Sequence, residues 1–182
     1  TEYWHSWTGL PKDSGRDFVP RLGVRPGSIF DPPELLVRFL LGDAAVPCTC
    51  SVLFRREVAK RVGGFDDSFP RAYEDQVFYA RVCLEARVLV LDHCWDRYRQ
   101  WAGSMCPTAD ASDEARDSRL AYLEGLSVRM EERGVTHRGL IRALEEQLSD
   151  FRPSGFFGVP RLLRYVRRRI RKVYRRVLGR LP

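Results

Sequence analysis

The stretch from residue 45 to residue 91 constrains the fold of this 182-residue chain more than any other. Residues 45–54 are mostly apolar or small and rich in β-branched side chains, a composition typical of a buried strand. A helical pattern over residues 74–86 and a further apolar run over residues 87–91 follow. Strand, helix and strand in succession predict an α/β fold, in which ligands bind at the loops between the elements.

A double glycine, Gly63-Gly64, follows a short helical run over residues 56–62. A glycine ends a helix at little cost, because it reaches the left-handed backbone region freely. Adjacent glycines also let backbone amides approach an anionic ligand closely. The sequence leaves both interpretations open.

Two adjacent acids, Glu74 and Asp75, open the helical pattern over residues 74–86. Carboxylates in the first turn interact favourably with the positive end of the helix dipole, which is the structural interpretation. The same placement keeps Asp75 ionised, and a fixed carboxylate can accept a proton from an approaching hydroxyl. The pair is therefore either a cap or a catalytic acid–base group.

These features belong to a series of motifs that follow one another in a fixed order. The series consists of a strand-like run at residues 48–54 with Arg55-Arg56-Glu57, the loop Val62-Gly63-Gly64-Phe65-Asp66, the pair Glu74-Asp75 and the segment Tyr98-Arg99-Gln100-Trp101. In this order the motifs resemble the second half of the family 2 glycosyltransferases of the GT-A fold, over about residues 1–152. The resemblance implies a partial GT-A-like sheet with flanking helices, followed by C-terminal helices.

The resemblance also implies roles for individual residues. Asp75 resembles the catalytic base that deprotonates an acceptor hydroxyl, and Glu74 is its partner in the pair. Gly63 and Gly64 resemble the loop that faces the donor sugar, and Arg99 resembles a cation beside the departing diphosphate. The substrates implied are a nucleotide-sugar donor and a glycan or lipid-linked acceptor.

Aromatic side chains are the candidates for acceptor binding. Trp4 lies in the aromatic segment TEYWHSWTG, which is either an edge strand or loop that buries aromatic rings or a surface that stacks on sugar rings. Tyr98 and Trp101 complete the set. Many relatives have a histidine where this chain has Trp101, and an indole cannot ligate a cation.

The metal and the donor are expected to bind elsewhere. In the family, an Asp-x-Asp pair in the first half of the fold holds the metal and the diphosphate, and this sequence contains no Asp-x-Asp. We therefore expect no metal ligand in this chain, with any Mg²⁺ or Mn²⁺ bound by a missing N-terminal half of the same protein. The isolated chain is expected to be inactive for the same reason.

The remaining sequence predicts a simple domain organisation. Residues 1–110 form the transferase part, 111–152 a helical extension and 153–182 a basic tail. Residues 10–33 are predicted to be a long loop, with Asp31 capping a short helix that ends near Gly42. The five cysteines have no Cys-x-x-Cys spacing and are expected to be buried thiols in a reducing cytosol.

The tail after Gly158 carries ten basic residues and no acid, with apolar residues at three- and four-residue steps. This pattern predicts a basic amphipathic helix that lies on an anionic membrane surface. Packing against the donor half is the second interpretation, and nucleic-acid contact by charge is the least favoured. No apolar run is long enough to cross a bilayer, so we expect a cytoplasmic protein, peripheral at the inner face of the membrane.

Two functions from different classes follow from these patterns. The first is a fragment of an inverting glycosyltransferase that moves a sugar from a nucleotide-sugar donor to a hydroxyl acceptor. The second is a non-catalytic domain that binds a membrane surface or nucleic acid through its basic C-terminal helix, in which Glu74 and Asp75 only cap a helix.

Overall fold

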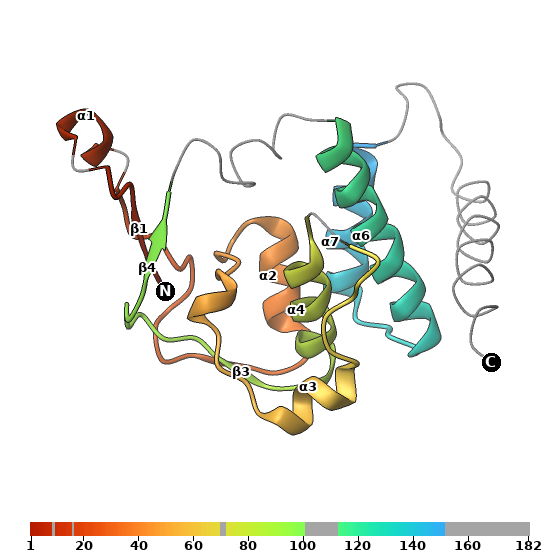
Figure 1. Cartoon of the computed structure of the whole chain (residues 1–182). Coiled ribbons are helices and arrows are strands. Elements are labelled where there is room, and N and C mark those ends of the chain that lie inside the picture. The colour runs from red at the N-terminus through yellow and green to blue at the C-terminus, as the bar shows by residue number, and fades with distance from the viewer. Residues whose placement is uncertain (9, 16, 70–71, 101–112, 152–182) are drawn as a thin grey trace, which may run out of the picture. The chain divides into compact units, whose positions relative to one another are not determined.

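Helices form most of the regular structure in the computed structural model, which describes residues 1–8, 10–15, 17–69, 72–100 and 113–151 (Figure 1). The chain divides into two units, Thr1–Ser149 and Asp150–Pro182, and the elements below belong to the first. The predicted basic tail lies outside the described residues. The helices are α1 Pro11–Ser14, α2 Glu34–Leu41, α3 Arg56–Val62, α4 Glu74–Glu85, α6 Asp113–Glu132 and α7 Arg138–Ser149.

The helices end where the sequence predicts. Gly42 and Gly63 both adopt left-handed backbone at the C-terminal ends of α2 and α3, with φ of 73° and 87°. Gly134, with φ of 61°, follows α6 in the same way. The predicted helices over residues 56–62 and 74–86 are therefore confirmed, and the predicted helical extension contains the two helices α6 and α7.

The strands are short and form two separate pairs. Strand β1, Tyr3–His5, runs parallel to β4, Arg97–Arg99, while β2, Ile29–Phe30, runs antiparallel to β3, Val88–Leu89. The described part of the chain is thus a mixed α/β structure, as predicted at that level. Its small sheets are made by strands that are distant in sequence.

The predicted strand over residues 45–54 is wrong. This segment is irregular and contains one 3₁₀ turn, η1, at Thr49–Ser51. Pro47 has no backbone N–H to give to a sheet, and the Ser51 hydroxyl bonds to carboxylates instead of packing in an apolar layer. The strand–helix–strand alternation expected from the sequence is therefore not the one that the chain forms.

The loop predicted for residues 10–33 is also wrong in part, because it contains α1 and β2. Asp31 does not cap α2: Pro33 occupies the cap position, and no side chain bonds to the first turn. The Asp31 carboxylate instead pairs with Arg87, whose Nε lies 2.8 Å from its Oδ1. This pair joins the segment after β2 to the segment before β3.

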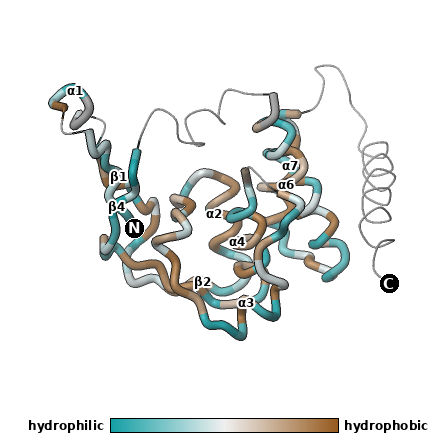
Figure 2. Tube along the Cα trace, in the orientation of Figure 1, coloured by the Kyte–Doolittle hydropathy of each residue, from teal (hydrophilic) through white to brown (hydrophobic). Residues whose placement is uncertain are grey.

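The core lies where the helices meet. Helix α4 packs against α2, α3 and α6, and α7 packs against α2 and α6. Figure 2 shows hydrophobic residues concentrated around α2 and along α4 beyond its first turn. The most deeply buried large side chains are Leu36 on α2, Val62 on α3, Phe78 on α4, Leu123 on α6 and Leu140 on α7.

A buried carboxylate holds three of these helices together. Glu85, at the end of α4, has a side chain only 8% exposed and lies 2.8 Å from a nitrogen of Arg133 and 3.3 Å from one of Arg129. Arg61 of α3 approaches the same carboxylate at 3.6 Å. Because a buried charge is stable only when it is paired, this cluster fixes the end of α4 against α3 and α6.

The cysteine prediction is confirmed in part. Cys83 is buried in α4 and Cys48 is half-buried, but Cys50 and Cys94 are exposed. All four are free thiols, and Cys106 lies outside the described residues.

Candidate functional site

The acidic pair stands at an abrupt corner of the backbone. Tyr73, the residue before α4, has φ of 70°, a left-handed conformation that costs a non-glycine residue roughly 1–3 kcal/mol. Its ring stacks on Tyr122 of α6, with ring centroids 5.6 Å apart, so tertiary packing supports the strained residue. The corner directs Glu74 and Asp75 into the first turn of α4.

The sequence led us to expect that the helix start keeps Asp75 ionised, but its environment instead raises the pKa of this carboxyl above the ordinary value. Burial raises the pKa of Asp75, and the neighbouring charge of Glu74 raises it further. A backbone hydrogen bond opposes both effects, because Asp75 Oδ1 accepts the Gln76 N–H at 2.6 Å. A carboxylate with a raised pKa is a stronger base than one in water, which suits proton abstraction from a hydroxyl.

Glu74 is the less satisfied member of the pair. Its Oε2 is buried and accepts no hydrogen bond from any residue that the structure describes. Asp75 accepts the Gln76 N–H in the first turn of α4, whereas the N-cap residue, Tyr73, makes no side-chain cap bond. Capping therefore accounts for one bond of Asp75 but not for the unpaired oxygen of Glu74.

The double glycine is a helix terminator in this structure. Gly63 and Gly64 both have positive φ, 87° and 67°. The Gly63 N–H donates to the Lys60 carbonyl and the Gly64 N–H to the Ala59 carbonyl, so both amides complete α3. The interpretation in which these two amides face an anionic ligand does not hold here, and any contact with a donor sugar would use other atoms of the loop.

Side chains of α4 fix the loop that follows the glycines. Arg81 donates to the Gly64 carbonyl at 3.4 Å and forms an ion pair with Asp66. Phe65 stacks on Phe78 with centroids 4.6 Å apart. Burial works against the charge of Asp66, but hydrogen bonds from Ser68 and the guanidinium of Arg81 outweigh it and lower the pKa of this carboxyl.

Helix α4 therefore carries the acidic pair in its first turn and also holds the glycine loop through Arg81. Arg81 is six residues after Asp75, or roughly 9 Å along the helix axis at about 1.5 Å per residue. Sequence reasoning assigned no role to Arg81, and it included Asp66 only as part of the loop motif. The opposite charges were visible, but their pairing depends on a loop returning over α4.

Three further candidate residues, Trp4, Tyr98 and Arg99, lie in the β1–β4 pair, which we term the aromatic ladder. Trp4 is paired in register with Tyr98, with centroids 4.5 Å apart, and stacks on Phe18 at 5.4 Å. Its indole Nε1–H donates to Glu2 Oε1 at 3.0 Å. The structure thus brings Trp4 and Tyr98 together, while Trp101 lies outside the described residues.

Arg99 belongs to the ladder and not to the α4 site. It is exposed on β4, in register with His5. Among the described residues, its side chain forms no hydrogen bond or ion pair with α4 or with the glycine loop. The structure therefore joins Asp75 and the glycine loop through α4, and leaves Arg99 on a separate element.

The turn η1 lies between the ladder and α4. On the ladder side, the Ser51 hydroxyl lies 2.8 Å from Glu2 Oε2 and 3.1 Å from Asp96 Oδ1. On the other side is Tyr79 of α4: burial raises its pKa to about 12, and the charge of Asp75 contributes to the rise. Sequence reasoning missed Ser51, Glu2 and Asp96, because nothing local signals that residues so distant converge.

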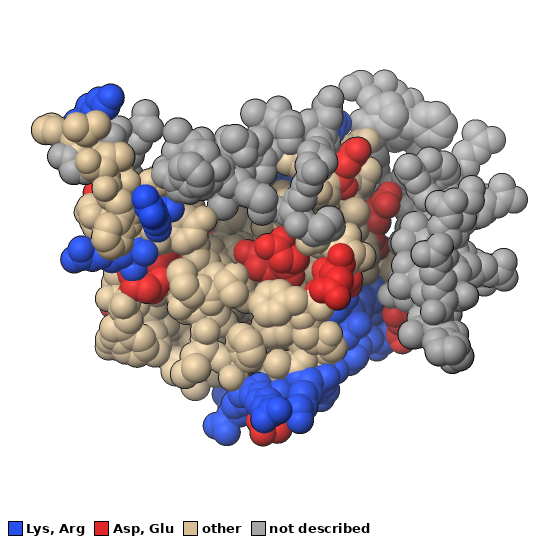
Figure 3. All heavy atoms as spheres, in the orientation of Figure 1, with Lys and Arg blue, Asp and Glu red and all other residues tan. Residues whose placement is uncertain are grey.

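Surface charge separates on the face shown in Figure 3. Basic side chains gather at the lower edge, where α3 lies in Figure 1, and the exposed bases of that helix are Arg56, Lys60 and Arg61. Acidic side chains gather in the middle of this face. The Arg-Arg motif thus contributes a positive surface close to a negative one.

Metal ligands are not grouped in the described part of the chain: no three His, Cys, Asp or Glu residues there could hold a metal ion together. No helix among the described residues has the length and apolar character needed to cross a bilayer. Comparisons of the chain with family models, with curated proteins and with solved structures found no match.

Proposed function

We propose that this chain is the acceptor-side half of an inverting family 2 glycosyltransferase, which transfers a sugar from a nucleotide-sugar to a hydroxyl of a glycan or lipid-linked acceptor. The order of the sequence motifs supports the proposal. The observation that carries it is Asp75, a partly buried carboxylate with a raised pKa, held by a strained corner at the start of the helix that also anchors the glycine loop.

In the proposed reaction, Asp75 accepts the proton of the acceptor hydroxyl. The acceptor oxygen forms a bond to the anomeric carbon as the bond from that carbon to the diphosphate breaks, and the nucleoside diphosphate leaves. Burial, together with the charge of Glu74 beside it, keeps the pKa of Asp75 raised. Any divalent metal and its ligands are assigned to a donor-binding half outside residues 1–182.

The test is Asp75→Asn in the longest natural polypeptide that contains this chain. Nucleotide release and product formation are measured with a panel of nucleotide-sugars, and donor binding is measured separately. We expect turnover to fall about 10²- to 10⁴-fold, the range for loss of a general base, with donor affinity nearly unchanged. Asp67→Asn, an exposed acid of the glycine loop, is the matched control. Unchanged turnover in Asp75→Asn would remove this residue from the mechanism.

A second candidate is non-catalytic binding to an anionic membrane surface, favoured by the ten bases and absence of acids after Gly158. It is compatible with a cytoplasmic protein at the inner face of the membrane. Removing residues 158–182 should release the protein from anionic vesicles in a sedimentation assay, whereas Asp75→Asn should not. Binding that persists at low salt after the truncation would assign attachment to another part of the chain.

A further inference from the structure

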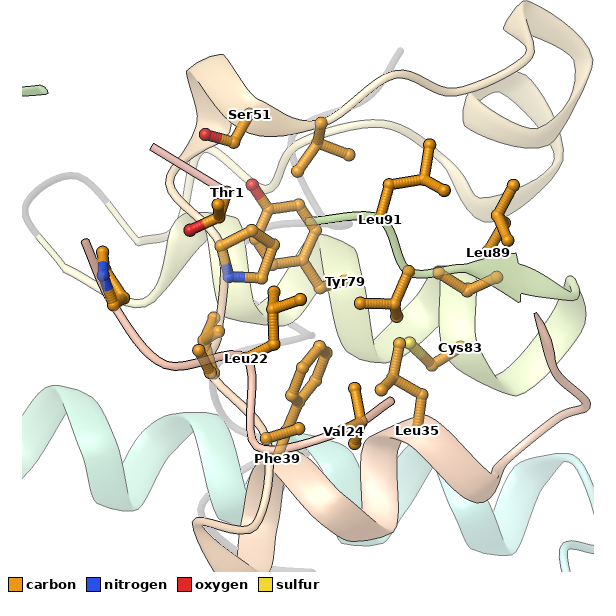
Figure 4. A pocket seen from close by; sticks show the side chains of 18 of the residues that line it. Thr1, Leu22, Val24, Leu35, Phe39, Ser51, Tyr79, Cys83, Leu89 and Leu91 are labelled. Atoms are coloured by element: carbon orange, nitrogen blue, oxygen red, sulfur yellow. The ribbon is translucent and has the colours of Figure 1, made fainter. Parts of the chain in front are cut away.

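A cavity of about 160 Å³ lies on the side of α4 that faces α2 (Figure 4). Its walls come from α2, α4, residues 20–24, residues 44–53 and the chain around β3. Most of its lining is apolar, and includes Leu22, Val24, Leu35, Phe39, Val82 and Cys83. An apolar cavity of roughly this size, about 150 Å³ in a well-studied engineered case, stays dry and accepts a single-ring hydrocarbon.

One end of the cavity is polar. Tyr79 is 6% exposed, and Figure 4 shows its oxygen at the end of the cavity occupied by Ser51. This hydroxyl is buried and makes no hydrogen bond of normal geometry with any described residue, although Thr49 is close enough to affect its pKa. Glu2, 3% exposed, also lines this end.

A buried hydroxyl without a partner is unfavourable, because it has lost its bonds to water and gained none. The neighbouring polar groups already have partners: Glu2 accepts from Trp4 and Ser51. Tyr79 is therefore the group at this end with an unmade bond. A ligand that brings one hydroxyl would satisfy it.

The cavity also reaches the surface. Leu53, Leu89 and Leu91 line it and are 99%, 53% and 38% exposed. Exposed leucines at the edge of an apolar cavity give an apolar molecule a route from solvent without crossing the polar end.

We propose that this cavity binds a small phenol or alcohol, with its hydrocarbon body among the apolar side chains and its hydroxyl bonded to Tyr79. The site goes beyond the proposed sugar transfer and does not depend on it. A ligand of about one aromatic ring fits the volume, and the position of Tyr79 selects for a hydroxyl at one end of the ligand.

The test compares p-cresol with toluene, which have nearly the same shape and differ by one hydroxyl. Binding to the 182-residue chain is measured by ligand-observed NMR titration and by calorimetry. We expect saturable binding of both, with p-cresol about fivefold tighter, the ratio that corresponds to one hydrogen bond of about 1 kcal/mol. Tyr79→Phe should abolish or reverse the preference for p-cresol, because its hydroxyl then enters the cavity without a partner.

A pair of variants at Val24 tests the location. Val24→Phe fills the cavity and should abolish binding of both probes, whereas Val24→Ala enlarges it and should preserve binding. Thermal unfolding establishes that each variant is folded, and Cys83→Leu is a second filling variant if Val24→Phe does not fold. The proposal is overturned by absence of saturable binding to the wild type, by a p-cresol preference that survives Tyr79→Phe, or by filling variants that bind normally.

Discussion

The start of α4 and the aromatic ladder both carry residues singled out in the sequence, but they are held in different ways. Helix α4 is in contact with three other helices, and its Phe78 is 1% exposed. The ladder consists of two strands of three residues, and its Trp4 and Tyr98 are only half-buried. A catalytic group needs a fixed position, so the helix start is the better place for one, and the ladder is better suited to contacts that adapt.

The largest difference between the two regions should appear on truncation of their central aromatic rings. Phe78→Ala should lower the free energy of unfolding by about 3–5 kcal/mol, because the ring is fully buried. Trp4→Ala should cost less, about 1–2 kcal/mol, because this residue is only half-buried. Urea denaturation at 25 °C measures the free energy of unfolding of both variants. Equal losses of stability would mean that α4 and the ladder hold their central rings equally firmly.

The next effect concerns the buried charge at the far end of α4. Glu85→Gln should destabilise the protein by about 2 kcal/mol, less than a fully buried ion pair, because Arg61 and Arg133 are partly exposed. Glu57→Gln, an exposed acid of α3, is the control and should change little. A neutral result for Glu85→Gln would mean that apolar packing alone fixes this end.

A smaller effect of opposite sign is expected at Asp75. Folding raises the pKa of Asp75 above its ordinary value of 3.8. As pH rises from 3.8 through the folded pKa, the unfolded state loses this proton more readily than the folded state, so ionisation of Asp75 destabilises the fold. Asp75→Asn should therefore raise the melting temperature at neutral pH, and the gain should disappear below about pH 3.8. Thermal melts across this range test it, and a variant less stable than wild type at pH 7 would contradict the raised pKa.

Asp66, in the loop that Arg81 of α4 holds, supplies the opposite case. Its pKa is lowered on folding, so its contribution to stability is present above 3.8 and is lost as pH falls through the folded pKa. Asp66→Asn should lower the melting temperature at neutral pH and have no effect in strong acid. If both aspartate variants shift stability in the same direction, the electrostatic contrast between the corner and the glycine loop is wrong.

The smallest effect on stability is expected on the ladder. Arg99→Ala should change the free energy of unfolding by less than about 0.5 kcal/mol, because the side chain is exposed. In the proposed enzyme the same change should weaken both donor binding and turnover, while Arg97→Ala, two residues earlier on the same strand, should not. If Arg99→Ala changes neither donor binding nor turnover, Arg99 has no part in the proposed reaction.

The helices could be predicted because their signals are local. The glycines that end α2, α3 and α6 act on backbone within one turn, and the apolar spacing of α2 and α7 is visible in a short window. The same reasoning placed Glu74 and Asp75 in a first turn. It did not show that Tyr73 before them would be left-handed, because stacking on Tyr122 supports that conformation.

The strands could not be predicted because their partners are distant. Residues 45–54 have a strand-like composition, but no strand of the described chain pairs with them, and the ladder joins residue 3 to residue 97. The strand β2 is two residues long and is recognisable only by its pairing with β3. Local pattern sets helices, whereas pairing across the chain decides which apolar runs become strands.

The Ser51 hydroxyl has a consequence for how the ladder begins. It carries a single hydrogen but lies within 3.2 Å of three carboxylate oxygens, one from Glu2 and two from Asp96. At any instant only one of those oxygens receives the hydrogen, so carboxylates far apart in the sequence share it by rotation of one bond. The Ser51 hydroxyl hydrogen therefore links two carboxylates, Glu2 just before β1 and Asp96 just before β4, at the point where the two strands of the ladder begin.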